Sequence, residues 1–442
     1  LVRIMKSVSF CLNLLKTKKI NRNFELRGYN LNVHCFKEEI EYSSLKYSTS
    51  TKGLRLYTCG LTEHGGLGLQ KENSILQRYI ARPVQHRFAE ENCVTDVTCG
   101  FGFTAIAVSS NDRIKLYGCG INTDRQINEE DNDLICCPKP LNIGIQDTRT
   151  NIVSLSAGRA HLAVVTDKEG AFLLGSNCYG QCGRAINPEE KSNGAFTINC
   201  IRDLDGECIT NVCCGQDHTL FLTTKGEVYS CGWGVDGQTG QGHTQNVCIP
   251  AKVKGDLKGE KIIKIAGRSD TALALNCKGE VFGWGCSEYL QLSPAKEVQQ
   301  LNSPCHLKHL SSLGRIVDIS AGGTSCMVLT ESGDVYIWGY GILGAGPELQ
   351  KTNVPTLLPR TLFGCNEASP GITVVSIASG LTYMTAINSC SHMYSWGHNK
   401  HGCLGIGHIR DQYFPYKVAI GALAVKARCG LDHTMVLCKP MG

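Results

Sequence analysis

Short apolar runs that end in a glycine-containing turn recur along the whole chain. The run at residues 56–60 (LYTCG) is typical, and six closely similar runs follow it. Apolar runs of this length, bounded by glycine turns, predict β-strands rather than helices. Successive copies lie 53 to 60 residues apart and end at Gly60, Gly120, Gly175, Gly232, Gly285, Gly339 and Gly397.

A second repeated element lies between these runs. It begins with a small residue and a glycine, continues to a histidine, threonine or tyrosine, and ends in an apolar stretch, as in residues 214–223 (CGQDHTLFLT). Most copies then pass through a charged glycine turn into the next run, which predicts an antiparallel hairpin. The glycines of this element are Gly100, Gly158, Gly215, Gly267, Gly322, Gly380 and Gly430, and its histidines are His161, His218 and His433.

Proline-led stretches at residues 250–253 and 415–418 supply a further short strand. Four short strands in each repeat, with no amphipathic helix between them, indicate the blade of a β-propeller and exclude a parallel α/β fold. The chain enters the repeat half-way near residue 53 and leaves it half-way after His433. We therefore predict an all-β, seven-bladed propeller over residues 53–440, closed by pairing of the first strand with the last strands.

Residues 1–52 differ from the rest of the chain in charge. They contain ten Lys/Arg and four Glu, a net charge of +6, which leaves −1 for residues 53–442. The first 24 residues have six basic and no acidic side chains, and Val8, Cys11, Leu12 and Leu15 would share one helical face. This pattern predicts a mitochondrial targeting leader and linker over residues 1–52. A basic disordered tail is the alternative.

The near-neutral body argues against a protein that binds nucleic acid mainly by neutralising phosphates. The 25 cysteines form no CxxC pairs, and many occupy equivalent repeat positions. They are interpreted as reduced, small buried residues, which is typical of a reducing compartment. No apolar run has the length needed to cross a bilayer.

Residues 232–237 match the string G-x-G-x-x-G of dinucleotide-binding loops. That interpretation requires a helix after the string, whereas the same turn recurs in the other repeats, so we expect a blade turn with positive φ. Neither Cys305, His306 and His309 nor Cys178 and Cys182 form a four-ligand metal set. The sequence predicts no metal site and no cofactor.

Asp217-His218 and Asp432-His433 look like acid–base pairs. Because His161 occupies the same repeat position, we interpret these histidines as structural donors that bond to backbone near the innermost strand. No P-loop, nucleophile elbow or HExxH motif occurs. We therefore assign no catalytic residue and expect no bond-making enzyme.

Residues 396–405 (WGHNKHGCLG) and 175–183 (GSNCYGQCG) resemble the signature turn of the regulator-of-chromosome-condensation (RCC) repeat family. The resemblance covers residues 53–440 in seven copies. The leader and the segments 229–234, 338–344 and 405–415 resemble a mitochondrial member of this family. The resemblance implies a location in the mitochondrial matrix or in peripheral association with the inner membrane.

The resemblance also implies guanine-nucleotide exchange, because the family's founding member releases nucleotide from Ran with a wedge on its propeller face. For the mitochondrial branch it implies the dynamin-like GTPase of inner-membrane fusion as partner. The near-uniform repeat intervals predict no long inserted wedge in this chain. A ring that pairs its own edges predicts a monomer.

An alternative implied by the same resemblance is a scaffold in assembly of the large mitochondrial ribosomal subunit. Its partners would be ribosomal RNA and assembly proteins, with RNA contacts limited to a few local Lys/Arg. Repeat positions that depart from the consensus are the best candidates for partner contact. Residues 268–270 replace the usual x-Asp-His. Residues 410–415 combine arginine with two aromatic residues on an expected blade-edge loop. These aromatic side chains either contact a partner or pack between blades. The candidates are Arg159, Arg184, Arg268, Asp270, Arg410, Asp411, Tyr413 and Phe414.

Overall fold

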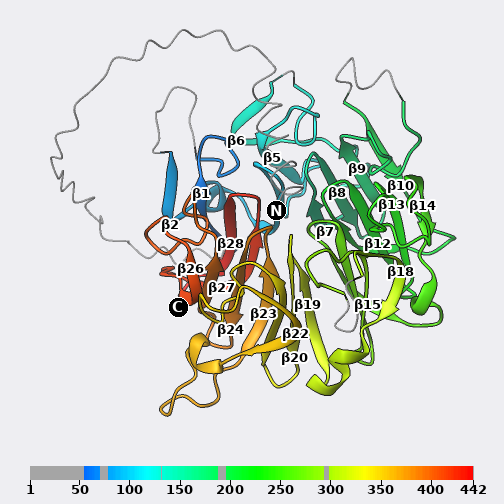
Figure 1. Ribbon diagram of the computed structural model, residues 1–442. Coiled ribbons are helices and arrows are strands. Elements are labelled where there is room, and N and C mark those ends of the chain that lie inside the picture. Colours follow the sequence, from blue (N-terminus) through cyan, green and yellow to red (C-terminus); the bar gives the residue numbers. More distant parts are fainter. Residues whose placement is uncertain (1–53, 70–77, 131, 188–195, 293–297, 442) are drawn as a thin grey trace, which may run out of the picture. The chain divides into compact units, whose positions relative to one another are not determined.

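The computed structural model describes residues 54–69, 78–130, 132–187, 196–292 and 298–441 (Figure 1). Within these residues the chain forms seven four-stranded antiparallel sheets, which we number as blades 1 to 7 in ring order. The predicted all-β, seven-bladed propeller is thus confirmed. The predicted leader, residues 1–52, lies outside the described residues.

Blades 2 to 7 each contain four strands that are consecutive in the sequence, the first of them nearest the central axis. Blade 2 consists of β3 (Val94–Cys99), β4 (Phe103–Val108), β5 (Leu116–Ile121) and β6 (Leu134–Pro140). Blade 3 consists of β7 (Ile152–Ala157), β8 (His161–Thr166), β9 (Gly170–Gly175) and β10 (Ile198–Ile201). Blade 4 consists of β11 (Ile209–Cys214), β12 (His218–Thr223), β13 (Val228–Gly232) and β14 (Val247–Lys252). Blade 5 consists of β15 (Ile262–Ala266), β16 (Thr271–Asn276), β17 (Val281–Cys286) and β18 (Gln300–His306). Blade 6 consists of β19 (Ile316–Ala321), β20 (Ser325–Thr330), β21 (Val335–Tyr340) and β22 (Lys351–Leu358). Blade 7 consists of β23 (Val374–Ser379), β24 (Tyr383–Asn388), β25 (Met393–Gly397) and β26 (Gln412–Lys417).

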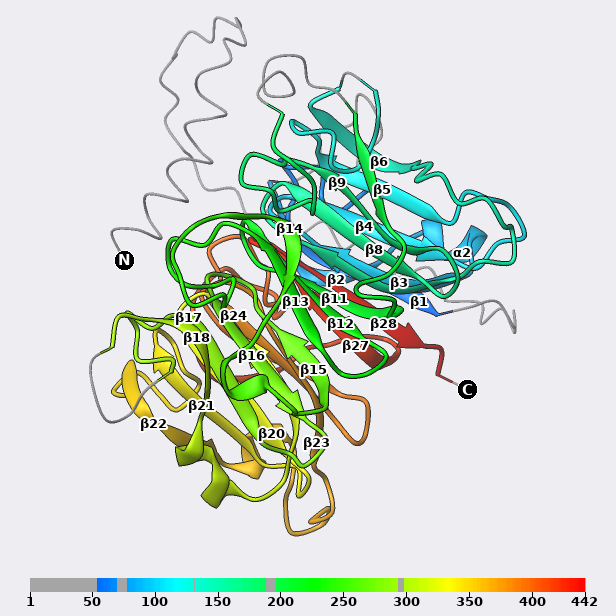
Figure 2. The same ribbon diagram turned by 90° about the vertical axis from the view of Figure 1, so that its right-hand side faces the viewer.

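Blade 1 is built from both ends of the propeller sequence. Its strand order is β2 (Tyr79–Gln85), β1 (Arg55–Leu61), β28 (His433–Lys439) and β27 (Leu423–Cys429). The pairing of β1 with β28 runs from Arg55 opposite Cys438 to Gly60 opposite His433. Figures 1 and 2 show the blue β1 beside the red β28. This pairing leaves neither half-repeat with an open edge toward the other.

The second strand of blades 2 to 7 is buried along its whole length. All six residues of β12 are buried, whereas β14 at the outer edge is partly exposed. A central strand with a neighbouring blade on each side must be apolar on both faces, so these strands appear in the sequence as continuous apolar runs. The three largest fully buried side chains are Trp284, Trp338 and Trp396.

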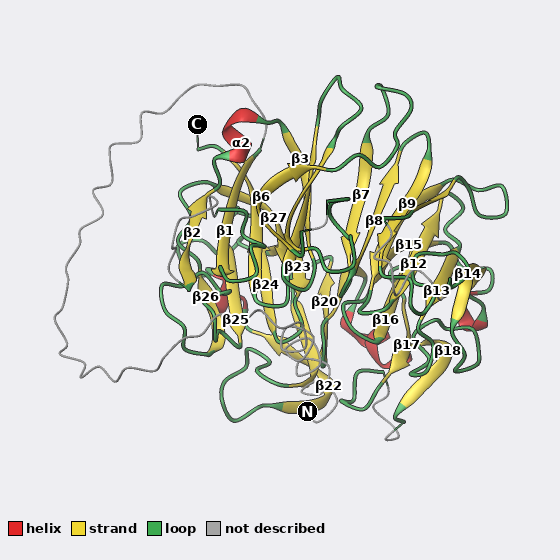
Figure 3. Cartoon of the chain, turned by 90° about the horizontal axis from the view of Figure 1, so that it is seen from above, coloured by secondary structure: helices red, strands yellow, loops and turns green. Residues whose placement is uncertain are grey.

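In the described part of the chain, helical structure is confined to the linkers between blades (Figure 3). It comprises α2 (Phe88–Glu91) and the 3-10 turns η1 (Gly255–Leu257), η2 (Lys308–Leu313) and η3 (Arg360–Phe363). Within the described residues, no helix has the length and apolar character to cross a membrane.

The strand register defines two faces of the ring. In blade 4 the end of β13 pairs with the start of β12, Gly232 opposite His218. The turn between first and second strands and the loop between third and fourth strands therefore lie at the same end of a blade, which we call the loop face. The opposite end, the hairpin face, carries the second-to-third hairpins and the linkers between blades.

Candidate protein-interaction face

The repeat histidines of blades 1 and 3 bond to a threonine of the next blade. His433 Nε2 lies 2.9 Å from Thr104 Oγ1, and His161 Nε2 lies 3.0 Å from Thr219 Oγ1. The Thr104 hydroxyl donates its own proton to the Gly66 carbonyl at 2.7 Å. The histidine Nε2 must therefore carry a proton and donate. The sequence predicted backbone partners, whereas the structure gives threonine hydroxyls that tie one blade to the next.

His218 in blade 4 occupies the same position without such a partner. The equivalent of the threonine in blade 5 is Ala272, which pairs with Trp284 as Thr219 pairs with Cys231. Neither Nδ1 nor Nε2 of His218 has a hydrogen-bond partner. Burial lowers the pKa of His218 to about 4, so the ring is neutral at physiological pH.

The glycine three residues before this position makes room for the ring. A Cβ on Gly215 would lie 2.0 Å from Cε1 of His218. In blade 5 Thr271 replaces the ring, and the hairpin register places Arg268 where the other blades have glycine. The sequence assignment of Gly267 to this repeat position was therefore wrong by one residue. A Cβ on Gly267 would meet no atom closer than 3.2 Å.

The seven glycines at the ends of the third strands have a different requirement. All have positive φ, from 92° at Gly285 to 122° at Gly60. A Cβ on Gly60 would lie 2.4 Å from the Asp432 carbonyl oxygen, across the pairing of β1 with β28. Only glycine combines this conformation with so close an approach of two backbones.

A buried ionic network joins the two ends of the ring on the loop face. His64 Nδ1 lies 2.9 Å from one oxygen of Asp432, and His433 Nδ1 lies 3.5 Å from the other. Burial alone would raise the pKa of Asp432, but His433 and His64 hold it well below its usual range. Although burial opposes the charge on His433, Cys99 and Asp432 raise its pKa to about 9.

Two predicted residues, Arg159 and Asp270, meet in an acidic cluster on the loop face of blades 3 to 5. Arg159 forms an ion pair with Asp217 at 2.5 Å, and Asp270 accepts a hydrogen bond from Gln238 Nε2 at 3.0 Å. Burial, Asp236 and Asp217 raise the pKa of Asp270 to about 7. We call Asp217, Asp236 and Asp270 the acidic cluster, and Arg159 is the cation paired with it.

Half-buried aromatic pairs lie on the same face, and the sequence analysis missed them. Tyr179 of blade 3 and Trp233 of blade 4 have ring centroids 4.6 Å apart, and Tyr289 and Tyr340 pair at 5.9 Å between blades 5 and 6. Val235, two residues after Trp233, is 40% exposed. An aromatic residue next to the signature-turn glycines was a visible signal, since partly exposed Trp and Tyr are enriched at protein interfaces.

Arg184, Arg410 and Asp411 contribute to signature turns. Asn177 Nδ2 donates to the Arg184 carbonyl at 3.2 Å, and Asn399 Nδ2 donates to the Arg410 carbonyl at 3.1 Å. The Asp411 carboxylate accepts a bond from the Asn399 backbone N–H at 2.9 Å. In these contacts the backbone of each arginine closes a turn.

Tyr413 and Phe414 lie on strand β26 rather than on the predicted blade-edge loop. The Gly346 N–H of blade 6 donates to the Tyr413 carbonyl at 3.1 Å, and a Cβ on Gly346 would lie 3.1 Å from the Phe414 ring. Phe414 nevertheless remains 44% exposed. The pair belongs to the junction of blades 6 and 7, whereas Arg159 and Asp270 belong to blades 3 to 5.

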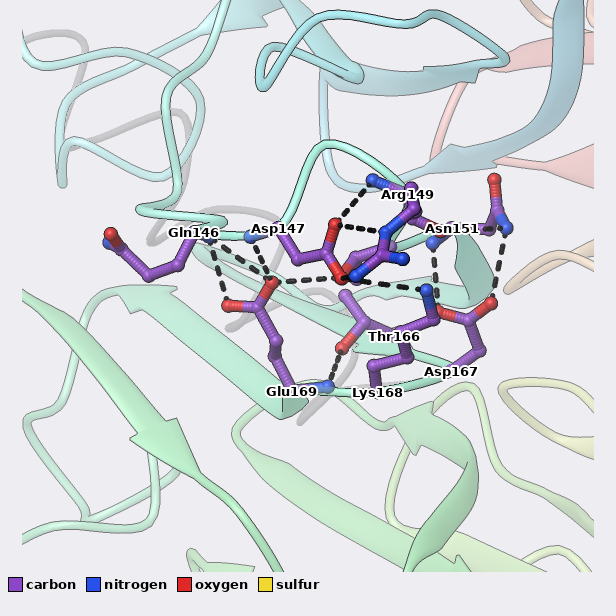
Figure 4. A network of polar contacts seen from close by, with 9 residues as sticks. Gln146, Asp147, Arg149, Asn151, Thr166, Asp167, Lys168 and Glu169 are labelled. Atoms are coloured by element: carbon purple, nitrogen blue, oxygen red, sulfur yellow. Dashed lines mark hydrogen bonds and ion pairs between the residues drawn. The ribbon is translucent and has the colours of Figure 1, made fainter.

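The hairpin face carries a polar network that fixes the linker between blades 2 and 3 (Figure 4). Glu169 in the β8–β9 turn accepts bonds from the Gln146 and Asp147 N–H groups and from Thr150 Oγ1 at 2.8 Å. Asp147 in turn binds Arg149 through two hydrogen bonds. Because both carboxylates bind groups of this linker, the network stabilises the conformation of the linker, and we do not interpret it as a binding or catalytic site.

The longest linker of this face spans residues 359–373, between β22 and β23. Arg360 anchors its start through a bidentate contact with Asp334, at 2.6 and 3.0 Å. Asn366 and Ser369 form an isolated bridge at its tip. The other linkers have 5 to 11 residues, so this loop of 15 residues is the part of the described chain that departs most from uniform blades.

No group of three or more His, Cys, Asp or Glu within the described residues could hold a metal ion. The 23 cysteines of the described chain are all free. The string at residues 232–237 leads from β13 to the next strand, β14, and Gly232 and Gly237 both have positive φ. It is a blade turn and not a dinucleotide-binding loop.

Family models of the regulator of chromosome condensation (RCC1) repeat match residues 55–107, 209–238, 225–275, 278–329, 316–344 and 392–437. The chain is 42% identical over 367 residues to the human "RCC1-like G exchanging factor-like protein", covering 81% of this chain and 79% of that protein. The mouse protein of the same name is 39% identical over 404 residues, or 87% of each chain.

The crystal structure of human WBSCR16 superimposes with a TM-score of 0.83 at 39% identity, covering 87% of this chain and 100% of that one. Prp20p from Saccharomyces cerevisiae has the same fold, with a TM-score of 0.71 at 18% identity over 89% of this chain and 93% of that one. On the repeat matches and the 42% identity, this chain belongs to the RCC1 repeat family.

Proposed function

We propose that this protein binds a GTPase through the loop face of blades 3 to 5 and promotes release of its guanine nucleotide. The names of its human and mouse relatives support an exchange factor. The observation that carries the proposal is the acidic cluster, which places three carboxylates and one arginine beside the Tyr179–Trp233 pair.

An exchange factor must bind the nucleotide-free GTPase more tightly than the loaded one. When nucleotide leaves, the GTPase exposes the lysine and backbone N–H groups that held the phosphates. In the acidic cluster burial raises the pKa of Asp217 and of Asp270 although Arg159 lies beside them, so a further cation supplied by the GTPase would stabilise their charged forms. The half-buried aromatics would supply the apolar anchor that such an interface needs.

The proposed partner is the dynamin-like GTPase of mitochondrial inner-membrane fusion, with the protein resident in the matrix or peripherally on the inner membrane. Support comes from the basic, acid-free first 24 residues. An import assay with isolated mitochondria tests the location: processing and protease protection are expected for the full chain. Nuclear accumulation in cells would contradict the location and redirect the search to nuclear GTPases.

Exchange is tested by the release of a fluorescent GDP analogue from the purified GTPase, with and without the propeller. We expect acceleration by the wild type, and loss of about tenfold or more for Asp217→Asn and Trp233→Ala, as for interface anchors. Asp147→Asn is the matched control, because Asp147 is also an arginine-paired carboxylate but lies on the hairpin face. Phe414→Ala is the control for Trp233, being a half-exposed aromatic of the outer strand.

No acceleration at micromolar propeller would contradict the proposal. Equal losses in the test and control variants would contradict its assignment to the loop face. Ribosome assembly, the alternative, predicts ribosomal RNA in crosslinked complexes from mitochondria. Recovery of that RNA without any exchange activity would favour the scaffold role.

A further inference from the structure

The central channel of the ring forms a cavity of about 370 Å³ lined by residues of all seven innermost strands. The hairpin registers place one residue of each strand at the same depth. These are Asp96, Ser154, Asn211, Lys264, Asp318, Ser376 and Lys426. Lys426 pairs with Asp96 at 2.8 Å and Lys264 pairs with Asp318, so this layer is balanced in charge.

The layers nearer the loop face carry two further cations without such balance. Arg428 lines the cavity and donates from Nε to the Val97 carbonyl at 3.3 Å. Within the described residues, neither Arg428 nor Arg268 forms an ion pair with a carboxylate. Four cationic side chains and Asp96 line the cavity, and Asp318 beside it pairs with Lys264, so the net charge of this group is +2.

Arg268 crosses the channel at its loop-face end. It occupies the position at which the other six blades have glycine, so no other side chain competes for this layer. From blade 5 its Nη1 donates to the Ala157 carbonyl of blade 3 at 3.0 Å and its Nη2 to the Gly100 carbonyl of blade 2 at 3.5 Å. Its guanidinium lies 5.6 Å from the Phe101 ring centroid of blade 2. Its Nε is buried and has no hydrogen-bond partner.

Buried cations without counter-charges are costly, and each unsatisfied guanidinium N–H adds to that cost. Mutual repulsion is already visible here: burial, followed by the nearby Arg428, lowers the pKa of Lys426. An anion in the cavity would meet two guanidinium forks, which suit phosphate and carboxylate oxygens. Ser156, whose hydroxyl oxygen accepts from the Cys214 N–H at 2.8 Å, would add a hydroxyl donor.

We propose that the channel is a binding site for a small, multiply charged oxyanion, held between Arg268 at the loop-face end and Arg428 below it. The cavity volume limits the ligand to a small molecule. The site is independent of any GTPase contact, because it lies inside the ring and not on the surface of blades 3 to 5.

Isothermal titration calorimetry with the full chain tests the site, using inorganic pyrophosphate as the phosphate probe and citrate as the carboxylate probe. We expect one ion bound per chain, and the stronger of the two probes identifies which oxygen chemistry the site prefers. Arg428→Gln should weaken binding by about tenfold or more, because a charge-assisted hydrogen bond is removed. Arg268→Gln should do the same.

Arg149→Gln is the matched control, since this arginine is 82% exposed on the hairpin face and should leave affinity unchanged. Circular dichroism confirms that each variant is folded, and Arg428→Gln decides the question if Arg268→Gln does not fold. Failure of both ions to bind the wild type would overturn the proposal. Binding that survives in folded Arg428→Gln with unchanged affinity would overturn it equally.

Discussion

Blades 1 and 4 carry the same dipeptide, Asp-His, at the same place in the repeat, yet the two copies have opposite protonation. In blade 1, Asp432 lies between His64 and His433, and the pKa of His433 is raised to about 9. In blade 4, the aspartate turns to Arg159 of blade 3, and His218 is left neutral with its pKa lowered to about 4.

The difference arises from neighbours and not from the dipeptide. Asp432 has two imidazoles within reach, and its charge is retained by protonating one of them. Asp217 already has a permanent cation in Arg159 and therefore gives His218 no charge to balance. At the other nitrogen of the imidazole, Nε2, His433 donates a hydrogen bond to the Thr104 hydroxyl. Ala272, at the equivalent position beside His218, has no hydroxyl to accept one.

The largest expected effect comes from removing the charge in blade 1. Asp432→Asn removes the counter-ion that keeps buried His433 protonated, so the imidazole loses its proton and the free energy of unfolding should fall by about 3 kcal/mol. Asp217→Asn should cost about 1 kcal/mol, because burial outweighs the attraction of Arg159 and raises the pKa of Asp217, so its negative charge contributes little to stability. Urea unfolding of both variants measures the contrast. Equal losses would mean that the two copies are held in the same way.

The pH dependence of stability should separate the two histidines next. His433 has a folded pKa above the ordinary value of 6.5, so its contribution is complete below pH 6.5 and is lost as pH rises through 9. His218 has a folded pKa below 6.5, so its contribution is present above pH 6.5 and is lost as pH falls toward 4. Each shift of about 2.5 pH units corresponds to about 3 kcal/mol at most.

Urea midpoints from pH 4 to pH 9.5 measure these losses. His433→Gln should reduce the loss of stability between pH 6.5 and about 8; at higher pH buried cysteines such as Cys59 and Cys119 reduce the stability of both proteins, because burial raises the pKa of their thiols. His218→Gln should reduce the loss on the acid side, where His161, with a pKa of about 3, still contributes. A wild-type profile that rises from pH 6.5 to 9 would contradict the assigned charge on His433.

The space around the ring of His218 gives a third contrast. Gly215→Ala forces a Cβ to within 2.0 Å of that ring and should cost about 2 kcal/mol through overpacking. Gly267→Ala, in the adjacent blade, should cost less, about 1 kcal/mol, because its tightest contact is 3.2 Å from the Thr271 carbonyl oxygen and needs only a small backbone shift. Thermal and urea unfolding of the pair test whether Arg268 or Gly267 occupies the repeat glycine position.

The sequence predicted the fold because each of its signals is local and repeated. Third-strand glycines such as Gly232 mark a hairpin whose geometry only glycine satisfies, and seven copies of that signal define seven blades. The half-repeats at the two ends predicted the pairing of β1 with β28, and this pairing is present in the structure.

The site was harder to predict because it depends on contacts between blades. Nothing near Asp217 in the sequence indicates that its cation is Arg159, 58 residues earlier. Likewise Arg268 appeared to follow the repeat glycine, and only the hairpin register shows that it replaces it. The β26 position of Tyr413 and Phe414 was missed because the strand pairs across a bulge after the signature turn.

The smallest effect would come from giving His218 the partner that the other histidines have. Ala272→Thr should raise the free energy of unfolding by about 1 kcal/mol, because the new hydroxyl would accept a bond from Nε2 of His218. Blades 2 and 4 accommodate Thr104 and Thr219 at the equivalent, fully buried position, so the repeat has space for the side chain. In a His218→Phe background the gain should disappear, and a double-mutant cycle isolates the pair. The phenylalanine ring has no hydrogen-bond donor, so a gain that persists in that background would come from the strand preference of threonine. The missing hydroxyl would then no longer explain why blade 4 differs from blade 1.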